Sequence, residues 1–219
     1  MIQKPYHPTR IFVIDEHPVY KYGLEELFRE SEDVVVCGYA TAIDQLDPST
    51  ASPDIFALDI VVDKRNGIES IKELNRQYPR ASILVASSQD ERIFAERCLR
   101  AGAKGYVMKT APIQEHLHAY KLLIGGNLYL SPPMKRDLLS RMSGHEAKGL
   151  SSLFDRLSNR ELLIIQHIGE SMDNREIAKE MNIRVKTIES HRSRIKSKLE
   201  LSNASELALI ATHLKHRKL

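Results

Sequence analysis

The sequence has few features of a secreted or membrane-embedded protein. It contains two cysteines in 219 residues, Cys37 and Cys98, and it lacks any apolar run long enough to cross a bilayer. The first residues, MIQKPYHPTR, are polar and do not form a signal-peptide pattern. We therefore expect two small core thiols rather than a disulfide or a metal pair, and a reducing, cytoplasmic location.

Internal repeats and low-complexity tracts are also absent, and the composition is that of a globular protein. Apolar residues make up 42% of the chain and charged residues 28%, which is ordinary for folded domains. The length is sufficient for two domains. The net charge of +3 is uneven, since residues 151–219 hold 13 of the 32 Lys+Arg but 9 of the 29 Asp+Glu. This small basic excess indicates a polyanionic partner for the last third.

The first half alternates strand-like apolar runs with amphipathic stretches of helical length. The apolar runs occupy 10–15, 33–38, 54–59, 82–87 and 105–109, and the helical patterns occupy 17–30, about 41–47, 66–78, 90–102 and 111–125. Such alternation predicts a parallel sheet that is covered by helices on both faces. Five such units favour an α/β doubly wound domain with five parallel strands in flavodoxin-like order.

The second half has only helical patterns. The Gly-Gly, Pro-Pro and Ser/Gly content of 125–152 predicts a linker with one helix around 133–142, and further helices are expected over 158–169, 174–181, 185–199 and 203–214. Ser158 with Glu161 and Asp173 with Glu176 have capping-box spacing. A short helix followed by a longer basic one predicts a helix-turn-helix within an all-α, four-helix domain. The predicted parts are a first domain over 1–127, a linker over 128–155 and a helical domain over 156–219.

Four of the predicted strands end on polar side chains. The ends are Asp15-Glu16, Asp59, Ser87-Ser88 and Lys109-Thr110. Because the carboxyl ends of parallel strands meet at one edge of the sheet, these groups are expected to surround one point near the switch in strand order. Each group alone would more often be a helix cap or a solvated strand end, but that alternative explains their joint placement poorly.

The residue types at these strand ends match one kind of chemistry. Three carboxylates at one point repel one another, and a hard cation such as Mg2+ relieves the repulsion. Lys109 and the Ser87 hydroxyl add what phosphoryl transfer needs, which is positioning and charge neutralisation. Since an Asp carboxylate can act as a nucleophile, we predict Asp59 as the phosphate acceptor and Asp15 and Glu16 as the metal holders beside it.

The same segments resemble the bacterial response-regulator receiver domains. The resemblance covers residues 10 to about 125 and rests on IFVIDEHPVYKYGL, PDIFALDI with Gly67 eight residues after Asp59, ILVASSQDE and AGAKGYVMK. The roles that it implies fall on the acceptor Asp59, the acidic pair Asp15 and Glu16, the phosphate-contacting Lys109, and the switch residues Ser87 and Tyr106. Two departures bear on the rate of phosphorylation: Val62-Asp63 stands where many receivers have Met-Pro, and Glu16 stands where Asp is common.

The segment 185–199 forms a two-sided helix at 100° per residue. Ile188, Ile195 and Leu199 align as a buried stripe, flanked by Val185, His191 and Arg192. The opposite face carries small polar and cationic side chains: Lys186, Ser190, Ser193 and Ser197, bordered by Glu189, Arg194 and Lys196. Such a face can enter a DNA major groove, although a Lys/Arg run is commonly a solvated surface.

The helical segments resemble the LuxR-type helix-turn-helix of the NarL/FixJ subfamily. The matching stretches, over about 156–214, are LSNRELLIIQHI, NREIAKEM and NIRVKTIESHRSRIKSKL. The resemblance implies DNA contacts by Lys186, Thr187, Glu189, Ser190, Arg192, Ser193, Arg194 and Lys196, with Arg192, Arg194 and Lys196 favouring phosphates. Glu189 replaces a frequent Lys, and Arg184 replaces a frequent Ser at the start of the helix.

These patterns together predict a DNA-binding transcriptional response regulator rather than an enzyme. A histidine kinase or a small phosphodonor would phosphorylate Asp59 with Mg2+, and the phosphorylated chain would bind double-stranded promoter DNA as a homodimer. The apolar residues of 204–214 are a candidate dimer surface, or they pack only within their own domain. Two alternatives stay open: a receiver that works without phosphorylation, supported by Val62-Asp63, and an Mg2+-dependent phosphohydrolase with Asp63 as a second acid.

Overall fold

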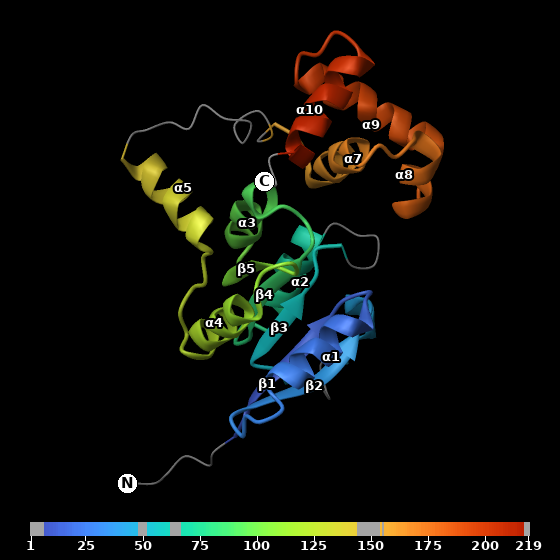
Figure 1. Cartoon of the computed structure of the whole chain (residues 1–219). Helices are drawn as coiled ribbons and strands as arrows, with labels where there is room; N and C mark the ends of the chain where they lie inside the picture. The colour runs from blue at the N-terminus through green and yellow to red at the C-terminus, as the bar shows by residue number, and fades with distance from the viewer. Residues whose placement is uncertain (1–6, 48–51, 62–66, 144–153, 155, 217–219) are drawn as a thin grey trace. The chain divides into compact units, whose positions relative to one another are not determined.

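A computed structural model describes residues 7–47, 52–61, 67–143, 154 and 156–216 of the chain (Figure 1). The chain divides into two compact units, Met1–Ala147 and Lys148–Leu219. The division falls inside the predicted linker of 128–155. Most of the second half of that linker lies outside the described residues, and so does the Val62-Asp63 loop.

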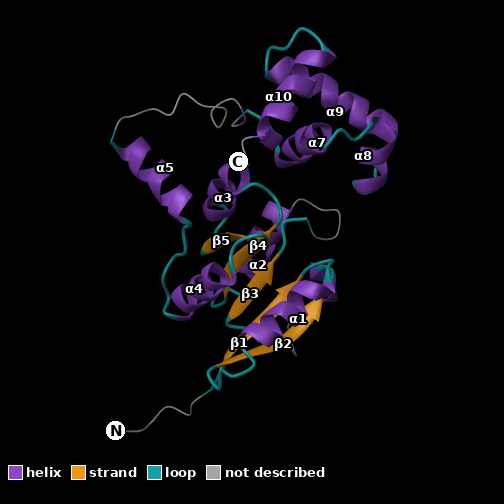
Figure 2. Cartoon of the chain, in the orientation of Figure 1, coloured by secondary structure: helices purple, strands orange, loops and turns teal. Residues whose placement is uncertain are grey.

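The first unit is built on a parallel sheet of five strands. The strands are β1 (Thr9–Ile14), β2 (Val34–Ala40), β3 (Ile55–Leu58), β4 (Ser82–Ser87) and β5 (Gly105–Met108). They pair in the order β2-β1-β3-β4-β5 (Figure 2). The central strand β3 is buried along its whole length, as expected when helices cover both faces of a sheet. The predicted doubly wound, flavodoxin-like fold is confirmed.

Three helices connect strands at the predicted places, and two more follow the last strand. They are α1 (Pro18–Leu27), α2 (Gly67–Gln77), α3 (Glu91–Arg100), α4 (Ile113–Ile124) and α5 (Pro132–Met142). Their starts have local causes. Pro18 opens α1, where its missing N–H needs no partner. The Asp90 carboxylate caps α3 by accepting from the Arg92 amide at 3.0 Å.

The helix predicted at about 41–47 is wrong. The structure has a single 3-10 turn there, η1 (Ile43–Gln45). The Gln45 side chain folds back and accepts hydrogen bonds from the amide and the hydroxyl of Thr41, at 3.0 and 3.2 Å. In addition, the residue before Pro48 is disfavoured in the α conformation, which shortens any helix that ends at Asp47.

The core of the first unit lies on both faces of the sheet. On one face, alternate residues of β1, β3, β4 and β5 pack against Leu24 and Phe28 of α1 and Ala119, Tyr120 and Leu123 of α4. The intervening strand residues point to the other face, where α3 contacts β5 and the Phe56 ring meets Tyr78 with centroids 5.0 Å apart. Both cysteines are free; Cys98 is buried on α3, as predicted for a core thiol, whereas Cys37 on β2 is only partly buried.

The chain beyond α4 stays attached to the edge of the sheet. Tyr129 is buried, its main chain bridges Gly105 of β5, and its hydroxyl donates to Glu115 at 3.1 Å. Residues 128–131 therefore pack on the first unit, although the predicted domain boundary at 127 stays a prediction.

The second unit is helical, with α7 (Asn159–Gly169), α8 (Asn174–Glu180), α9 (Val185–Lys198) and α10 (Ala204–His216). Both predicted capping boxes form. Ser158 and Glu161 exchange hydrogen bonds at the start of α7, and Asp173 and Glu176 do so at the start of α8. Each box satisfies amide groups that would lack a partner inside the helix. None of the helices in the described ranges has the length and apolar character needed to cross a bilayer.

A close approach at the start of α2 predicts the effect of adding one methyl group. A Cβ on Gly67 would lie 2.2 Å from the Ile60 carbonyl oxygen, in the segment that follows Asp59. We expect Gly67→Ala to lower the free energy of unfolding by about 1–3 kcal/mol, because main chain must move. The control is Gly23→Ala on α1, where a Cβ meets nothing within 4 Å and helix propensity predicts a gain of about 0.5–1 kcal/mol. Urea unfolding measures both, and equal midpoints for the two variants would contradict the prediction.

Candidate functional site

Two buried carboxylates form the centre of the first unit. Asp15 follows β1 and Asp59 follows β3, and these neighbouring strands flank the switch in strand order. The residues are 1% and 5% exposed. The Asp59 amide donates to the Ile14 carbonyl at 2.9 Å, so the sheet itself holds the two acids side by side. Buried charges of one sign are costly unless a partner neutralises them.

Lys109 is that partner. Its Nζ lies 2.6 Å from Asp15 Oδ2 and 2.5 Å from Asp59 Oδ2. Burial alone would lower the pKa of Lys109, but Asp59 and Asp15 outweigh it and raise this pKa above its ordinary value. The lysine therefore stays charged, and one ammonium serves two carboxylates that come from different strands.

The second oxygen of Asp59 has its own donors. Ser87, at the end of β4 and fully buried, donates from Oγ to Asp59 Oδ1 at 2.7 Å. The Val61 amide donates to the same oxygen at 3.1 Å. Both oxygens of the carboxylate are therefore held, which fixes its orientation within the pocket.

A chain of hydrogen bonds leads from Asp59 to Tyr106. Ser87 Oγ accepts from the Gln89 amide at 3.3 Å, and the Gln89 carbonyl accepts from the Tyr106 hydroxyl at 2.8 Å. The Tyr106 ring is buried, and burial raises the pKa of its hydroxyl well above the usual value. Of the two predicted switch residues, Ser87 therefore bonds directly to Asp59, and Tyr106 is linked to Ser87 through Gln89.

The donor set at this pocket fits a hard cation. Among the described residues, Asp15, His17 and Asp59 have ligand atoms within 4.8 Å of one another. The carboxylate oxygens are the ligands that Mg2+ prefers, whereas an imidazole is not. Receiver domains bind Mg2+ at this acidic pocket, and the residues present here suit that ion.

The sequence did not single out His17, and Glu16 is exposed and outside this three-residue group. Asp15 Oδ1 accepts from the His17 amide at 2.8 Å, which brings the ring of His17 to 3.3 Å from the same oxygen. The spacing D-x-H in IDEHP could have predicted this contact, because an Asp side chain often accepts from the amide two residues later in a turn.

In the second unit, α9 has the two faces that the sequence predicts. Ile188, Ile195 and Leu199 are buried. The exposed residues among the predicted DNA contacts are Lys186, Thr187, Glu189, Ser190, Ser193 and Arg194. The Ser190 hydroxyl donates to the Lys186 carbonyl of its own helix at 3.0 Å, and Arg184 supplies no side-chain cap.

Two predicted contacts, Arg192 and Lys196, are only partly exposed. Arg192 donates to Asn174 Oδ1 at 3.0 Å and so links α9 to α8. His191 is also partly buried, and burial, followed by the nearby Arg194, lowers its pKa. Some of the cationic side chains at the edge of the outer face of α9 are therefore partly packed against the rest of the second unit.

An ion pair between the buried Glu161 and the partly exposed Lys198 joins α9 to α7. Glu161 is 3% exposed and accepts from Lys198 Nζ at 2.7 Å, while its capping box with Ser158 uses the same carboxylate oxygen. Burial alone would raise the pKa of Glu161. Hydrogen bonds from Lys198 and Ser158 outweigh this effect, so the pKa lies below its ordinary value. The carboxylate that starts α7 thus also holds the last turn of α9.

Comparisons with known proteins match each unit to a family. Residues 11–121 match the response regulator receiver domain family, and residues 155–211 match the luxR family of bacterial regulatory proteins. The virulence factors putative positive transcription regulator BvgA of Bordetella pertussis is 32% identical over 204 residues, which cover 93% of this chain and 96% of BvgA. The oxygen regulatory protein NreC of Staphylococcus carnosus is 29% identical, over 90% of this chain and 94% of NreC.

Among solved structures, a similar fold occurs in RcsB from Salmonella enterica serovar Typhimurium, bound to promoter rprA in the presence of phosphomimetic BeF3-. The TM-score is 0.62 and the identity 23%, with 94% of this chain and 99% of that chain covered. This likeness supports the fold.

The Glu161 ion pair predicts a pH-dependent stability. Because the pKa of Glu161 is depressed on folding, its stabilisation is fully present above the unfolded pKa of about 4.3 and is lost as the pH falls through the folded pKa. We expect Glu161→Gln to lower the free energy of unfolding by about 1–3 kcal/mol at neutral pH, with the deficit shrinking below about pH 4. Urea unfolding over a pH series measures it. Glu180→Gln, at an exposed position of α8, is the control. A deficit in unfolding free energy of Glu161→Gln that does not change with pH would contradict the prediction.

Proposed function

The chain belongs to the NarL/FixJ subfamily of response regulators, which are DNA-binding transcription regulators, and we propose that phosphorylation of Asp59 controls its binding to promoter DNA. The observation that carries the proposal is the state of the Asp59 carboxylate, which is buried, oriented by Ser87 and neutralised by Lys109. A carboxylate held in this way is prepared for attack on phosphorus.

The chain's own residues account for the transfer. One oxygen of Asp59 forms the bond to phosphorus while the donor's bond to phosphorus breaks, and the donor's leaving group keeps that electron pair. The Lys109 ammonium balances the charge on the phosphoryl oxygens, and the Ser87 hydroxyl donates to one of them. Asp15, Glu16 and Asp59 are the residues that we assign to Mg2+, which when bound supplies further charge neutralisation.

The donor that we propose is a cognate histidine kinase or a small phosphodonor, and the receiver promotes only its own phosphorylation and dephosphorylation. Once phosphorylated, Asp59 no longer accepts in the same way from Ser87. The hydrogen-bonded chain through Gln89 to Tyr106 supports a route by which that change reaches the surface of the receiver. A packed aromatic has discrete positions, so the change can be two-state.

The DNA partner that we propose is double-stranded promoter DNA, which also places the activity in the cytoplasm. The outer face of α9 would enter the major groove, with Lys186, Glu189 and Ser190 near base edges. Arg194 and Lys196 would contact phosphates. Arg192, which donates to Asn174, would help to hold the helix as well.

We further propose that the phosphorylated chain binds as a homodimer. Leu207 and Ala211 of α10 are buried within the second unit, whereas Leu209 on the opposite side is 59% exposed. A helix with one packed face and one exposed leucine is consistent with a second packing surface, and two-fold binding doubles the base contacts of one short module.

Phosphate acceptance is tested by intact-protein mass spectrometry after incubation with Mg2+ and acetyl phosphate. We expect a mass gain of one phosphoryl group that is lost in Asp59→Asn, because the amide is not a nucleophile. Asp54→Asn makes the same chemical change at an exposed position on the start of β3 and should keep the gain. No gain in the unsubstituted chain, combined with DNA binding that Asp59→Asn leaves unchanged, would favour a receiver that works without phosphorylation.

DNA recognition is tested on sites selected from random double-stranded oligonucleotides. Arg194→Ala should weaken binding to all sequences alike and reduce the slope of log affinity against log salt by about 1. Glu189→Gln should instead change the preferred base at one position, by about 1–3 kcal/mol. Arg80→Ala, which removes an exposed arginine of the first unit, is the control for charge loss. Fluorescence anisotropy at several salt concentrations gives both quantities, and an Arg194→Ala slope equal to that of Arg80→Ala would overturn the assignment of a phosphate contact.

A further inference from the structure

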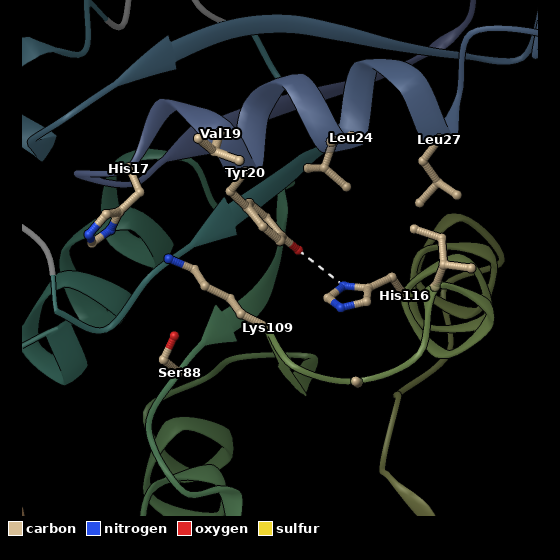
Figure 3. A pocket seen from close by; sticks show the side chains of 11 residues that line it. His17, Val19, Tyr20, Leu24, Leu27, Ser88, Lys109 and His116 are labelled. Atoms are coloured by element: carbon tan, nitrogen blue, oxygen red, sulfur yellow. Dashed lines mark hydrogen bonds between the residues drawn. The ribbon is translucent and has the colours of Figure 1, made fainter.

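An open cavity of about 490 Å³ lies beside the acceptor site, between α1 and α4 (Figure 3). Most of its wall is apolar and includes Val19, Leu24 and Leu27 of α1. Its inner wall is different, because Tyr20, His116 and Lys109 meet there (Figure 3). Polar side chains among aliphatic ones cost stability unless they have partners, so this cluster calls for an explanation.

Tyr20 connects the cavity to the acceptor site through its ring. The Lys109 Nζ lies over the face of this ring, 5.5 Å from the centroid. A cation within about 6 Å of an aromatic face is attracted by the negative potential of the ring. The same ammonium contacts Asp15 and Asp59. The Tyr20 ring is therefore a third contact of Lys109, the lysine that takes part in the proposed reaction.

The hydroxyl end of Tyr20 is held from α4. It lies 3.4 Å from His116 Nδ1 and 3.4 Å from the Tyr120 hydroxyl. Figure 3 shows the contact with His116, which spans from α1 to α4. Burial lowers the pKa of His116, more than hydrogen bonding to the Lys109 main chain raises it. Burial also raises the pKa of Tyr20. An uncharged imidazole nitrogen can accept a hydrogen bond from the protonated phenol, which keeps the ring of Tyr20 in one orientation.

We propose that Tyr20 is a positioning residue for phosphoryl transfer, and that its ring, held by His116 and Tyr120, keeps the Lys109 ammonium where the phosphoryl oxygens arrive. The inference rests on the proposed transfer to Asp59.

The physical need for this role lies in the lysine. A lysine side chain carries its charge at the end of a flexible stem of four carbons. Before transfer, two carboxylates hold it. When an oxygen of Asp59 forms the bond to phosphorus, that carboxylate loses negative charge and becomes a weaker partner. The Tyr20 ring does not change during the reaction, so its attraction for the ammonium persists while the other contacts exchange.

The first test is the rate of phosphorylation by acetyl phosphate with Mg2+. Tyr20→Leu removes the ring and should slow the reaction about fivefold. Tyr20→Phe keeps the ring but loses the hydroxyl contacts, so it should recover most of that loss. The matched control is Tyr22→Leu, because Tyr22 lies on the same helix, is 62% exposed, and has Lys21 rather than Lys109 over its ring.

A double-mutant cycle separates positioning from general damage to the fold. In a Lys109→Gln background, Tyr20→Leu should cause no further slowing, since the charge that the ring positions is gone. An equal fivefold loss with and without the Lys109 charge would overturn the proposal. A phosphorylation rate of Tyr20→Phe that is no higher than that of Tyr20→Leu would overturn the proposal as well.

A readout that needs no phosphorylation follows the lysine directly. In chains labelled with 13C-lysine, the Cε–H signal of Lys109 should carry a ring-current shift that is lost in Tyr20→Leu and kept in Tyr20→Phe. Absence of that shift overturns the positioning role even when the unsubstituted chain takes phosphate on Asp59 normally. Failure of the proposed function is recognised differently, because the unsubstituted chain itself then gains no phosphate, whatever the signal of Lys109 shows.

Discussion

The ion pair between Lys109 and the two carboxylates of Asp15 and Asp59 is the interaction on which the first unit depends. Each acid is almost fully buried, and neither would be stable there without a cation. The three residues follow three different strands, so they meet only if β1, β3 and β5 end near one another. The register provides this, since Ile14 pairs with Leu58, Leu58 with Val85, and Val85 with Tyr106. Asp15 and Asp59 each follow this row by one residue, and Lys109 follows it by three. The fold and the chemistry of the pocket thus impose the same constraint.

The second unit solves a similar problem with Glu161. This buried carboxylate is stable because Lys198 neutralises its charge and Ser158 donates a hydrogen bond to it. The pair joins the start of α7 to the last turn of α9, so α9 is held by charge as well as by its buried isoleucines. The outer face of α9 remains exposed as a result, which is what a DNA-reading surface needs.

The cluster around Tyr20 links the pocket of Asp15 and Asp59 to helices α1 and α4, which carry neither of these two acids. Its members come from α1 and α4, and the Tyr20 ring lies beside the Lys109 ammonium (Figure 3). Polar groups in such a position restrict the motion of their neighbours more than aliphatic ones, because a hydrogen bond has a direction. The placement of a flexible lysine is therefore a property of the helices as well as of the strand that it follows.

Local patterns in the sequence determined most of the architecture. The alternation of apolar runs and amphipathic stretches predicted the five parallel strands, and the spacings from Ser158 to Glu161 and from Asp173 to Glu176 predicted two helix starts, because these signals depend on neighbouring residues only. Motif resemblance added predicted roles for Asp59, Ser87 and Lys109. The prediction of a helix at 41–47 was wrong, because a hydrogen bond from the Thr41 amide to the Gln45 side chain competes with helix formation in this short segment.

Only the tertiary structure decided which side chains share a partner. Nothing near Tyr20 in the sequence points to His116 or Tyr120, which are about a hundred positions away. Equally, the separation between Glu161 and Lys198 hides the bond that orients α9. The physical reason is that capping and periodicity are local, whereas the contacts of a buried charge depend on how distant elements pack, and one sequence alone carries no local signal for that packing.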